Sequence, residues 1–401
     1  MSSTPASVEA FTQNRVGIAF ALIVSLFFMW GLSYGLLDVL NKHFQETLHV
    51  SRAQSGFLQM VYFGAYFLLA LPTAMLMNRW GYKPGILAGL CLFAVGALLF
   101  VPATRAASFG PFLFALFVLA SGIACLETAA NPYVTSLGDP TGAERRLNLA
   151  QSFNGMGQFL GPLIGGALFF DTEAHASVQM TYVTIGSLAL IVAALVLLTR
   201  LPDVREQERL AGPQQPTPLL QQRHFVFAVL AQFCYVGAQV GIGAFFINFA
   251  TEHGGMTSQR AAYLLSVGLF CFLAGRFVGT ALMGLIAPAR LLGAYAIASV
   301  ALTAVVVVGL PTLSVFALIA LFFFMSIMFP TIFALGIRNL GAETRRGASI
   351  LIMSIVGGAL APYVMGRIAD HARTALAFLL PAACFAIVAW YGFRGYKVRH
   401  E

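Results

Sequence analysis

Residues 291–337 read LLGAYAIASVALTAVVVVGLPTLSVFALIALFFFMSIMFPTIFALGI, a run of 47 residues without a charge. An α-helix rises 1.5 Å per residue, so about 20 apolar residues cross the roughly 30 Å hydrocarbon core of a bilayer. The run is too long for one crossing, and the Gly309-Leu310-Pro311-Thr312 segment in its middle predicts a turn. The stretch therefore predicts two membrane helices joined by a short loop.

The rest of the chain repeats this pattern. Of its 401 residues 59% are hydrophobic and 9% are charged, which excludes a water-soluble globule. Two further spans each contain one charge, Glu127 in 106–138 and Arg276 in 261–289. Eight uncharged runs are each long enough for one span: 16–37, 53–78, 84–104, 147–170, 174–199, 224–251, 347–366 and 374–393. The sequence therefore predicts an all-α integral membrane protein with twelve transmembrane helices.

The positive charges indicate the orientation of the chain. With both termini inside, sixteen of the 23 Lys and Arg residues fall in inner loops and six in outer loops. Cytoplasmic loops carry such an excess, so we expect both termini in the cytoplasm. The net charge of +8 is then explained by topology, and no nucleic-acid partner is expected.

The spans form two halves. The polar, proline-containing segment 200–223 separates an N-terminal half, 1–199, from a C-terminal half, 224–401. The sequence GAERR at 142–146 is echoed by GAETRR at 341–346, each before the fifth span of its half. Two six-helix pseudo-repeats predict a transporter that rocks about a central site.

Three charges are predicted to lie within the membrane: Asp38, Glu127 and Arg276. Because a charge at mid-bilayer costs roughly 2.5–3.5 kcal/mol on insertion scales, each is a candidate functional group. Asp38 and Glu127 can load and release a proton, although Asp38 can also simply cap the outer end of its helix. We interpret Arg276 as a conformational latch to inner-loop groups, with Arg79 in NRWGYK (78–83) as its first-half counterpart.

Polar and aromatic residues share helix faces with these charges. Amides and carboxylates bind vicinal hydroxyls and aromatic rings stack on a pyranose, so the set predicts a sugar site, although polar residues also hold membrane helices together. The predicted substrate-binding residues are Trp30, Tyr34, Asp38, Glu127, Asn131, Gln151, Asn154, Gln158, Gln232, Tyr235 and Gln239.

Two short patterns suggest other functions. Residues 157–166 fit a pattern associated with antiporters, which keeps an exporter as an alternative, although close helix packing explains the glycines as well. Residues 31–35 match the GxSxG nucleophile pattern, but they lie inside a predicted membrane helix and no histidine lies in a span to activate the serine. The five cysteines form no CxxC pair. We therefore expect no enzyme, no metal and no cofactor.

Several motifs resemble the fucose permease branch of the fucose-galactose-glucose:proton symporters, within the major facilitator superfamily. The resemblance covers about 25–395 and is carried by FFMWG (27–31), YFGAYFLLALP (62–72), LETAANPYV (126–134), LNLAQSFN (147–154), AQFCYVGAQVG (231–241) and FPTIFALGIRNLG (329–341). It implies that Asp38 and Glu127 are the membrane carboxylates tied to proton coupling and sugar binding, and that Gln151 and Asn154 line the cavity. Ser33, Tyr34 and Gly35 depart from it, because fucose permeases show Ala-Asn-Asn there.

These observations predict a monomeric twelve-helix transporter of the major facilitator fold in a bacterial inner membrane. It would import a fucose-like sugar or a hexose with protons, using the proton gradient as its energy source. The alternatives are a proton-coupled exporter of drugs or small metabolites and an uncoupled sugar uniporter.

Overall fold

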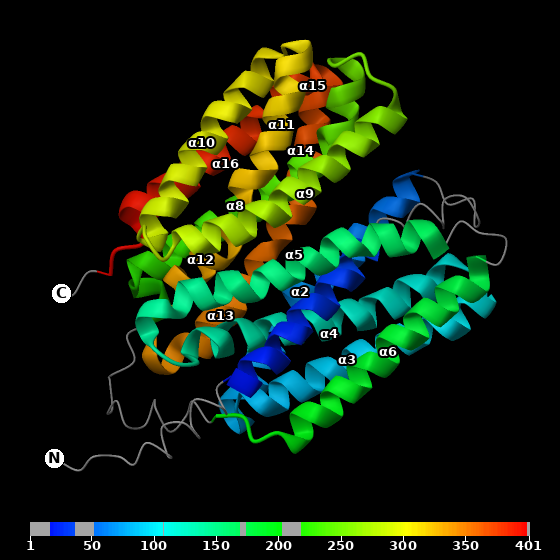
Figure 1. Cartoon of the computed structure of the whole chain (residues 1–401), viewed down its shortest axis with the longest axis vertical. Helices are drawn as coiled ribbons and strands as arrows, with labels where there is room; N and C mark the ends of the chain where they lie inside the picture. The colour runs from blue at the N-terminus through cyan, green and yellow to red at the C-terminus, as the bar shows by residue number, and fades with distance from the viewer. Residues whose placement is uncertain (1–16, 37–51, 107, 169–173, 203–217, 399–401) are drawn as a thin grey trace. The chain divides into compact units, whose positions relative to one another are not determined.

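The computed structural model describes residues 17–36, 52–106, 108–168, 174–202 and 218–398, and these residues form helices and turns with no strand (Figure 1). They fall into two compact units. The first comprises 1–146 with 156–215, and the second comprises 147–155 with 216–401. Helix α5 (Ala143–Leu168) thus contributes its middle segment to the second unit. Of the expected linker 200–223, residues 203–217 lie outside the described residues.

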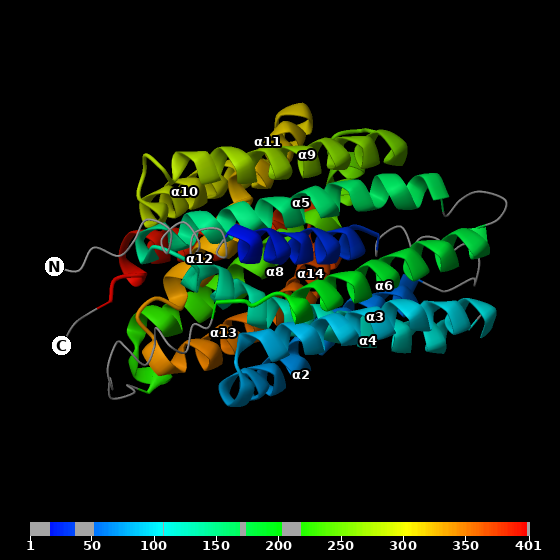
Figure 2. The same ribbon diagram turned by 60° about the horizontal axis from the view of Figure 1, so that its bottom comes forward.

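The first unit is a bundle of long helices. α3 packs against both α4 and α6, which run beside it in Figure 2. α2 packs mainly against α4 and more lightly against α3. The elements are the helix Gly17–Leu36, α2 (Arg52–Trp80), α3 (Tyr82–Ala106), α4 (Phe109–Ser136), the 3₁₀ turn η1 (Pro140–Gly142), the ends of α5, and α6 (Ala174–Leu198).

Glycines bring α3 and α4 into backbone contact. A Cβ on Gly96 would lie 2.2 Å from the Leu119 nitrogen, and one on Gly122 would lie 2.3 Å from the Phe93 nitrogen. Small residues allow membrane helices to approach this closely, so that dispersion contacts along the backbones hold the pair together. The contact sets the position of α4, the helix that carries Glu127.

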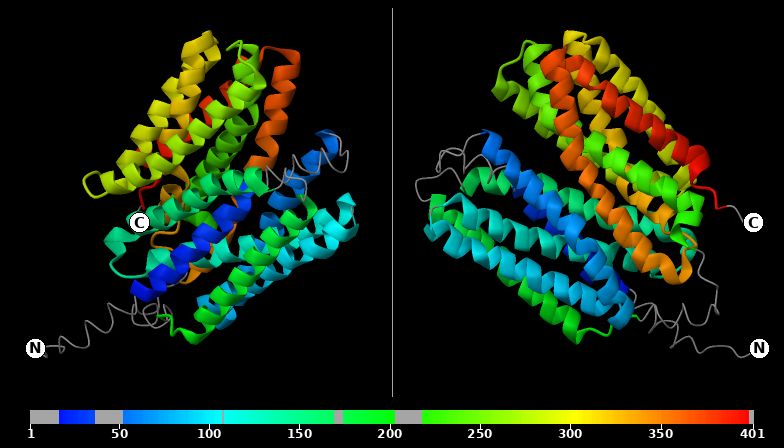
Figure 3. Two further views of the ribbon diagram at one scale, coloured as in Figure 1. Left: turned by 45° about the vertical axis from the view of Figure 1, so that its right-hand side comes forward. Right: turned by 180° about the vertical axis from the view of Figure 1, so that it is seen from behind.

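The second unit contains shorter and more interrupted helices. α10 packs against α11 and α16, seen as yellow and red helices in Figure 3. α8 packs against α14 and α16. The elements are η2 (Leu219–Gln221), α8 (Arg223–Glu252), α9 (Ser258–Leu282), α10 (Pro288–Val308), α11 (Pro311–Met325), α12 (Met328–Gly336), η3 (Gly341–Glu343), α13 (Thr344–Met353), η4 (Ser354–Val356), α14 (Gly357–His371), α15 (Thr374–Ala377), α16 (Leu379–Trp390) and η5 (Tyr391–Gly395).

The turn predicted inside 291–337 is confirmed. α10 ends at Val308, and the following Gly309 has a φ of 77°, a left-handed conformation that glycine adopts without strain; α11 begins at Pro311. The sequence pattern did not anticipate the interruption between α11 and α12 at Ser326 and Ile327. Pro330 has no N–H to donate to the Ser326 carbonyl, so the regular ladder fails there.

The membrane character of the chain is confirmed. Eleven helices within the described residues are long and apolar enough to cross a bilayer. α5 occupies the position of the predicted fifth span, 147–170, and carries the polar residues Asn148, Gln151, Asn154 and Gln158. The protein is therefore an all-α, multi-pass membrane protein.

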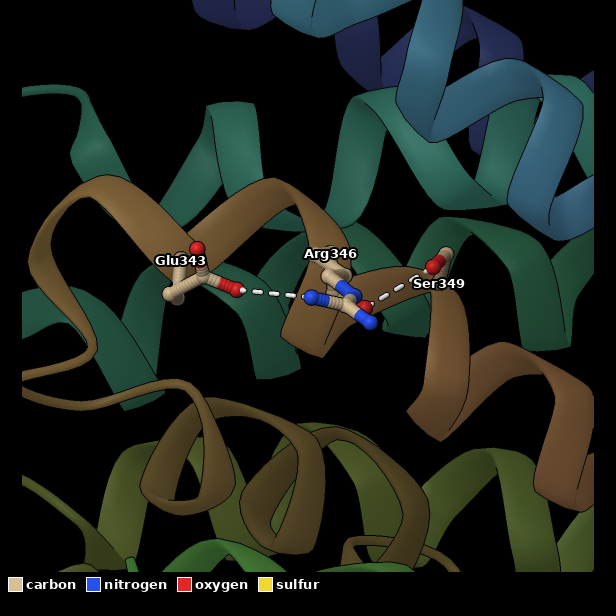
Figure 4. Close-up of polar contacts among 3 residues, drawn as sticks. All are labelled: Glu343, Arg346 and Ser349. Carbon is tan, nitrogen blue, oxygen red and sulfur yellow. Dashed lines mark hydrogen bonds and ion pairs between the residues drawn. The ribbon is translucent and has the colours of Figure 1, made fainter. Parts of the chain in front are cut away.

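The two copies of the repeated motif have the same local structure but use their arginines differently. Each lies at a 3₁₀ turn that leads into a helix, η1 before α5 and η3 before α13. In the first copy Arg146 donates to the carbonyls of Asp139 (2.7 Å) and Thr135 (2.9 Å), which caps the end of α4. In the second copy Arg346 is exposed and pairs weakly with Glu343 at 3.7 Å (Figure 4), while Arg345 is buried.

The η1 turn also holds a carboxylate in its ionised form. Asp139 accepts hydrogen bonds from the backbone nitrogen of Thr141 at 2.8 Å and from its hydroxyl at 2.9 Å. These bonds, with a smaller contribution from the charge of Arg146, lower the pKa of Asp139 below its ordinary value. The turn is thereby fixed at the entry to α5.

Candidate functional site

Glu127 is a buried carboxylate within α4, with 9% of its surface exposed. The hydroxyl of Tyr66 on α2 donates to its Oε1 atom across 3.2 Å. The hydroxyl of Tyr62, one helical turn earlier, lies 3.2 Å from that of Tyr66. α2 packs against α4, so Tyr66 reaches a carboxylate that is 61 residues away in sequence.

Sequence reasoning did not select Tyr62 or Tyr66. The signal that could have found them is their spacing of four residues within an uncharged span, which places both hydroxyls on one helix face. A second link between α2 and α4 lies nearby, where Thr73 donates to the Cys125 sulfur at 2.9 Å. The region around Glu127 is therefore a polar contact between two helices inside an apolar bundle.

The aromatic residues of the first stripe lie in the helix Gly17–Leu36. Trp30 is buried, its ring centroid lies 4.2 Å from that of Phe27, and its Nε1 atom has no hydrogen-bond partner among the described residues. Tyr34 is half-buried, with its ring 5.5 Å from that of Tyr62. Asp38, the third predicted member of this stripe, lies outside the described residues. The structure therefore connects this stripe to Glu127 through Tyr62.

Two predicted amides also lie in the first unit. Asn131 on α4 is fully buried and lies one helical turn after Glu127. Gln158 on α5 is half-buried. The stripe formed by Glu127 and Asn131 thus faces the protein interior, as a site in the bundle requires.

Arg276 on α9 forms a second polar cluster, within the second unit. Only 4% of its surface is exposed. Its Nη1 atom donates to Oε1 of Gln151 at 3.1 Å, to Oδ1 of Asn154 at 3.3 Å and to the backbone carbonyl of Gln151. Its guanidinium carbon lies 4.7 Å from the ring centroid of Phe272. Sequence reasoning expected Arg276 to bind inner-loop groups, whereas these hydrogen bonds join it to two predicted sugar-binding amides.

A further buried polar contact in the second unit joins α5 to α12. The side-chain nitrogen of Asn148 donates to the Thr331 hydroxyl at 3.1 Å, and both residues are buried. Neither residue was predicted as part of a site. Asn148 lies three residues before Gln151, so the α5 face that carries the predicted amides begins one turn earlier than expected.

The predicted residues of α8 have different surroundings. Gln232 is 0% exposed, and neither its amide nitrogen nor its amide oxygen has a hydrogen-bond partner among the described residues. Tyr235 donates to the Met325 carbonyl at 2.9 Å, where α11 ends. Gln239 is half-buried. Tyr235 therefore has a structural partner, while Gln232 keeps unused hydrogen-bonding capacity.

The predicted latch residue Arg79 is exposed at the end of α2. Its guanidinium carbon lies 5.0 Å from the ring centroid of Trp80. The neighbouring Lys83 donates to the carbonyls of Leu197 (2.8 Å) and Thr199 (2.9 Å) at the C-terminal end of α6. In this motif it is Lys83 that joins α3 to α6, through carbonyls at the C-terminal end of α6.

The glycines of the antiporter-like pattern pack against the helix Gly17–Leu36. A Cβ on Gly157 would lie 2.4 Å from the Phe28 carbonyl oxygen, and one on Gly161 would lie 2.7 Å from the Gly35 carbonyl carbon. Close backbone packing within the first unit therefore accounts for both glycines. Among the described residues, no group of three or more His, Cys, Asp or Glu side chains could hold a metal ion.

Comparison with known proteins connects this arrangement to transporters. The Major Facilitator Superfamily profile matches residues 18–356. The chain is 38% identical to the L-fucose-proton symporter of Escherichia coli K12, over 92% of this chain and 91% of that protein. It is 36% identical to a glucose/galactose transporter of Brucella abortus, over 99% and 98% of the two chains.

Solved structures agree with the sequence comparison. The crystal structure of the major facilitator transporter FucP in the outward conformation superposes with a TM-score of 0.87 at 37% identity, covering 96% of this chain and all of that one. Relatives of this kind are membrane transporters and not enzymes. The chain belongs to the major facilitator superfamily, in the branch that contains the L-fucose-proton symporter and the glucose/galactose transporters.

Proposed function

We propose that this protein imports a monosaccharide, a fucose-like sugar or a hexose, together with protons. The observation that carries the proposal is the buried carboxylate of Glu127, bonded to Tyr66, in a chain 36–38% identical to sugar transporters, one of them named as a proton symporter. A carboxylate in a low-dielectric interior is costly to move while ionised and cheap to move while protonated. Coupling follows if the carrier changes its access side readily only when fully loaded or empty.

The sugar would be bound by buried amides and aromatic rings. Gln151 and Asn154 are held by Arg276, and neither amide atom of Gln232 has a partner in the described part of the chain, so both could bind a ligand. Trp30 offers a buried ring and an indole N–H without a partner among the described residues. Neutral hydroxyl groups are suited to such donors and acceptors, and a lipophilic cation is not.

Several features of the proposal come from the sequence. Asp38 would share proton coupling with Glu127, the excess of Lys and Arg in the predicted inner loops favours cytoplasmic termini, and the membrane would be a bacterial inner membrane. The two predicted six-helix halves, 1–199 and 224–401, would alternate access as a monomer. The proton gradient would supply the energy, with no bound cofactor.

A two-step experiment tests the proposal. Thermal unfolding of the purified protein is measured with L-fucose, D-arabinose, D-galactose, D-glucose and D-mannose, and each stabilising sugar is added to proteoliposomes that contain a pH indicator outside. We expect sugar addition to make the external medium more alkaline, because each sugar enters with a proton. Sugar uptake that neither moves protons nor depends on pH would instead identify a uniporter. Proton flux driven by a lipophilic cation, with no response to sugars, would identify an exporter.

A further inference from the structure

The Tyr62–Tyr66 pair on α2 is the feature of the coupling site that sequence reasoning did not predict. Both side chains are buried. Their hydroxyls are 3.2 Å apart, and the Tyr66 hydroxyl is 3.2 Å from Oε1 of Glu127. The three polar groups therefore form one chain that runs from α4 along one face of α2.

The hydroxyl protons of the two tyrosines give this hydrogen-bonded chain a direction. Tyr66 has one hydroxyl proton, and it is donated to Glu127. A phenol oxygen can still accept, so the Tyr62–Tyr66 contact requires Tyr62 to donate to Tyr66. Every proton in the chain therefore points toward the carboxylate, which is the arrangement that favours a negative charge on Glu127.

The strength of the chain depends on the charge of Glu127. A hydrogen bond to an ionised carboxylate is roughly twice as strong as one between neutral groups, and successive bonds polarise one another in a low-dielectric interior. When Glu127 carries a proton, this additional stabilisation is lost. This hydrogen-bonded chain thus stabilises the carrier in which Glu127 is ionised more than the carrier in which Glu127 is protonated.

We propose that Tyr66 is the positioning residue that lets Glu127 release its proton within the membrane, and that Tyr62 acts only through Tyr66. This inference rests on the proposed role of Glu127 in proton coupling. The ring centroid of Tyr62 also lies 5.5 Å from that of Tyr34 on the helix Gly17–Leu36. The pair therefore lies between Glu127 and the helix Gly17–Leu36.

The other ionisable side chains on the helices around Glu127 either have contacts of their own or are exposed. From α2 the groups that face Glu127 are Tyr62 and Tyr66, and on α4 itself Cys125 accepts a hydrogen bond from Thr73. α3 carries four ionisable residues. Tyr82 lies beside the Tyr133 ring, and Lys83 donates to carbonyls at the end of α6. Cys91 and Arg105 are exposed. Of these groups, the two tyrosines are the ones that form the hydrogen-bonded chain to Glu127.

The direct test is an infrared titration of the purified protein in nanodiscs. The carboxyl band that Glu127→Gln removes belongs to Glu127, and its intensity is followed against pH. We expect Tyr66→Phe to move the midpoint to higher pH by about one to two units, the size of a lost charge-assisted hydrogen bond. Tyr62→Phe should move it less, and the double variant should match Tyr66→Phe alone. Tyr182→Phe, a buried ring stacked on Phe100, should leave the midpoint unchanged.

The possible outcomes separate the two proposals. A wild-type midpoint in Tyr66→Phe would overturn the positioning role, and a Tyr62→Phe shift that persists in the Tyr66→Phe background would overturn the chain. If Tyr66→Phe does not fold, Tyr62→Phe still decides, because an unshifted midpoint contradicts the proposal. Failure of the transport proposal would appear separately, as wild-type proteoliposomes in which none of the five sugars drives proton entry.

Discussion

Arg276 on α9 and Gln151 on α5 are joined through their side chains, with Nη1 of the guanidinium 3.1 Å from Oε1 of the amide. The same nitrogen donates to Asn154 at 3.3 Å. A guanidinium that is planar and always charged holds several acceptors in a set geometry, which an ammonium on a flexible stem does not. Arg276 is therefore hydrogen-bonded to two predicted sugar-binding amides, and its predicted role as a conformational latch stays a prediction.

Replacing Arg276 should affect both stability and sugar binding. Arg276→Gln removes hydrogen bonds from a buried charged donor, each worth about 1.5–3 kcal/mol, so we expect a lower melting temperature and a smaller stabilisation by sugar. Arg276→Lys should recover part of the stability but not the alignment of the amides. Arg290→Gln is the control, since exposed substitutions usually change stability by less than about 0.5 kcal/mol. Equal melting temperatures for wild type and Arg276→Gln would contradict this assignment.

Replacing Gln232 should raise the stability of the sugar-free protein, whereas replacing Arg276 should lower it. A buried polar group without a partner costs about 1–3 kcal/mol, so Gln232→Met, which has similar volume, should raise the melting temperature of the sugar-free protein. If Gln232 binds sugar, the same variant should lose the stabilisation that sugar gives the wild type. Asn248→Leu, at an exposed position on the same helix and outside the predicted site, is the control. A destabilised Gln232→Met would show that the amide already has a partner in the folded protein.

The two copies of the repeat should differ in which arginine of the pair contributes to stability. Arg146→Gln removes the cap of α4 and should cost about 1–2 kcal/mol of stability, while Arg145→Gln, at an exposed position, should be nearly neutral. In the second copy the order should reverse, with buried Arg345 sensitive and exposed Arg346 tolerant. Thermal unfolding of the four single variants checks this pattern. An equal loss of stability in Arg146→Gln and Arg346→Gln would mean that the position within the repeat, and not burial, determines the effect.

Glu127→Gln should separate coupling from transport. Glutamine keeps the volume and the acceptor oxygen that Tyr66 contacts, but it cannot ionise. We therefore expect proteoliposomes with this variant to exchange sugar across the membrane and to lose accumulation driven by a proton gradient. Asn131→Ala, one turn away on α4, should instead weaken sugar binding without making transport independent of pH. Uphill uptake at the wild-type level by Glu127→Gln would remove the role assigned to this residue.

The positions of the helices could be predicted from the sequence because each depends on local properties. Hydrophobic length marked the spans, and Gly309 with Pro311 marked the turn between two of them. The break at Ser326 and Ile327 was missed, because hydropathy does not register the loss of one backbone hydrogen bond before Pro330. Glu127 and Arg276 were selected for a similar local reason, since an isolated charge in a span is costly.

The partners of these charges were decided only by the tertiary structure. Tyr66 meets Glu127 across 61 residues, and Arg276 meets Gln151 across 125. Such contacts depend on the rotation and separation of whole helices, which glycines such as Gly96 and Gly122 set by allowing backbones to touch. The amino-acid sequence by itself determined that the chain spans a membrane many times and carries buried charges, because burial in lipid depends on each segment alone. Which side chains hydrogen-bond to those charged groups was decided by packing, because such partnerships depend on the positions of several helices at once.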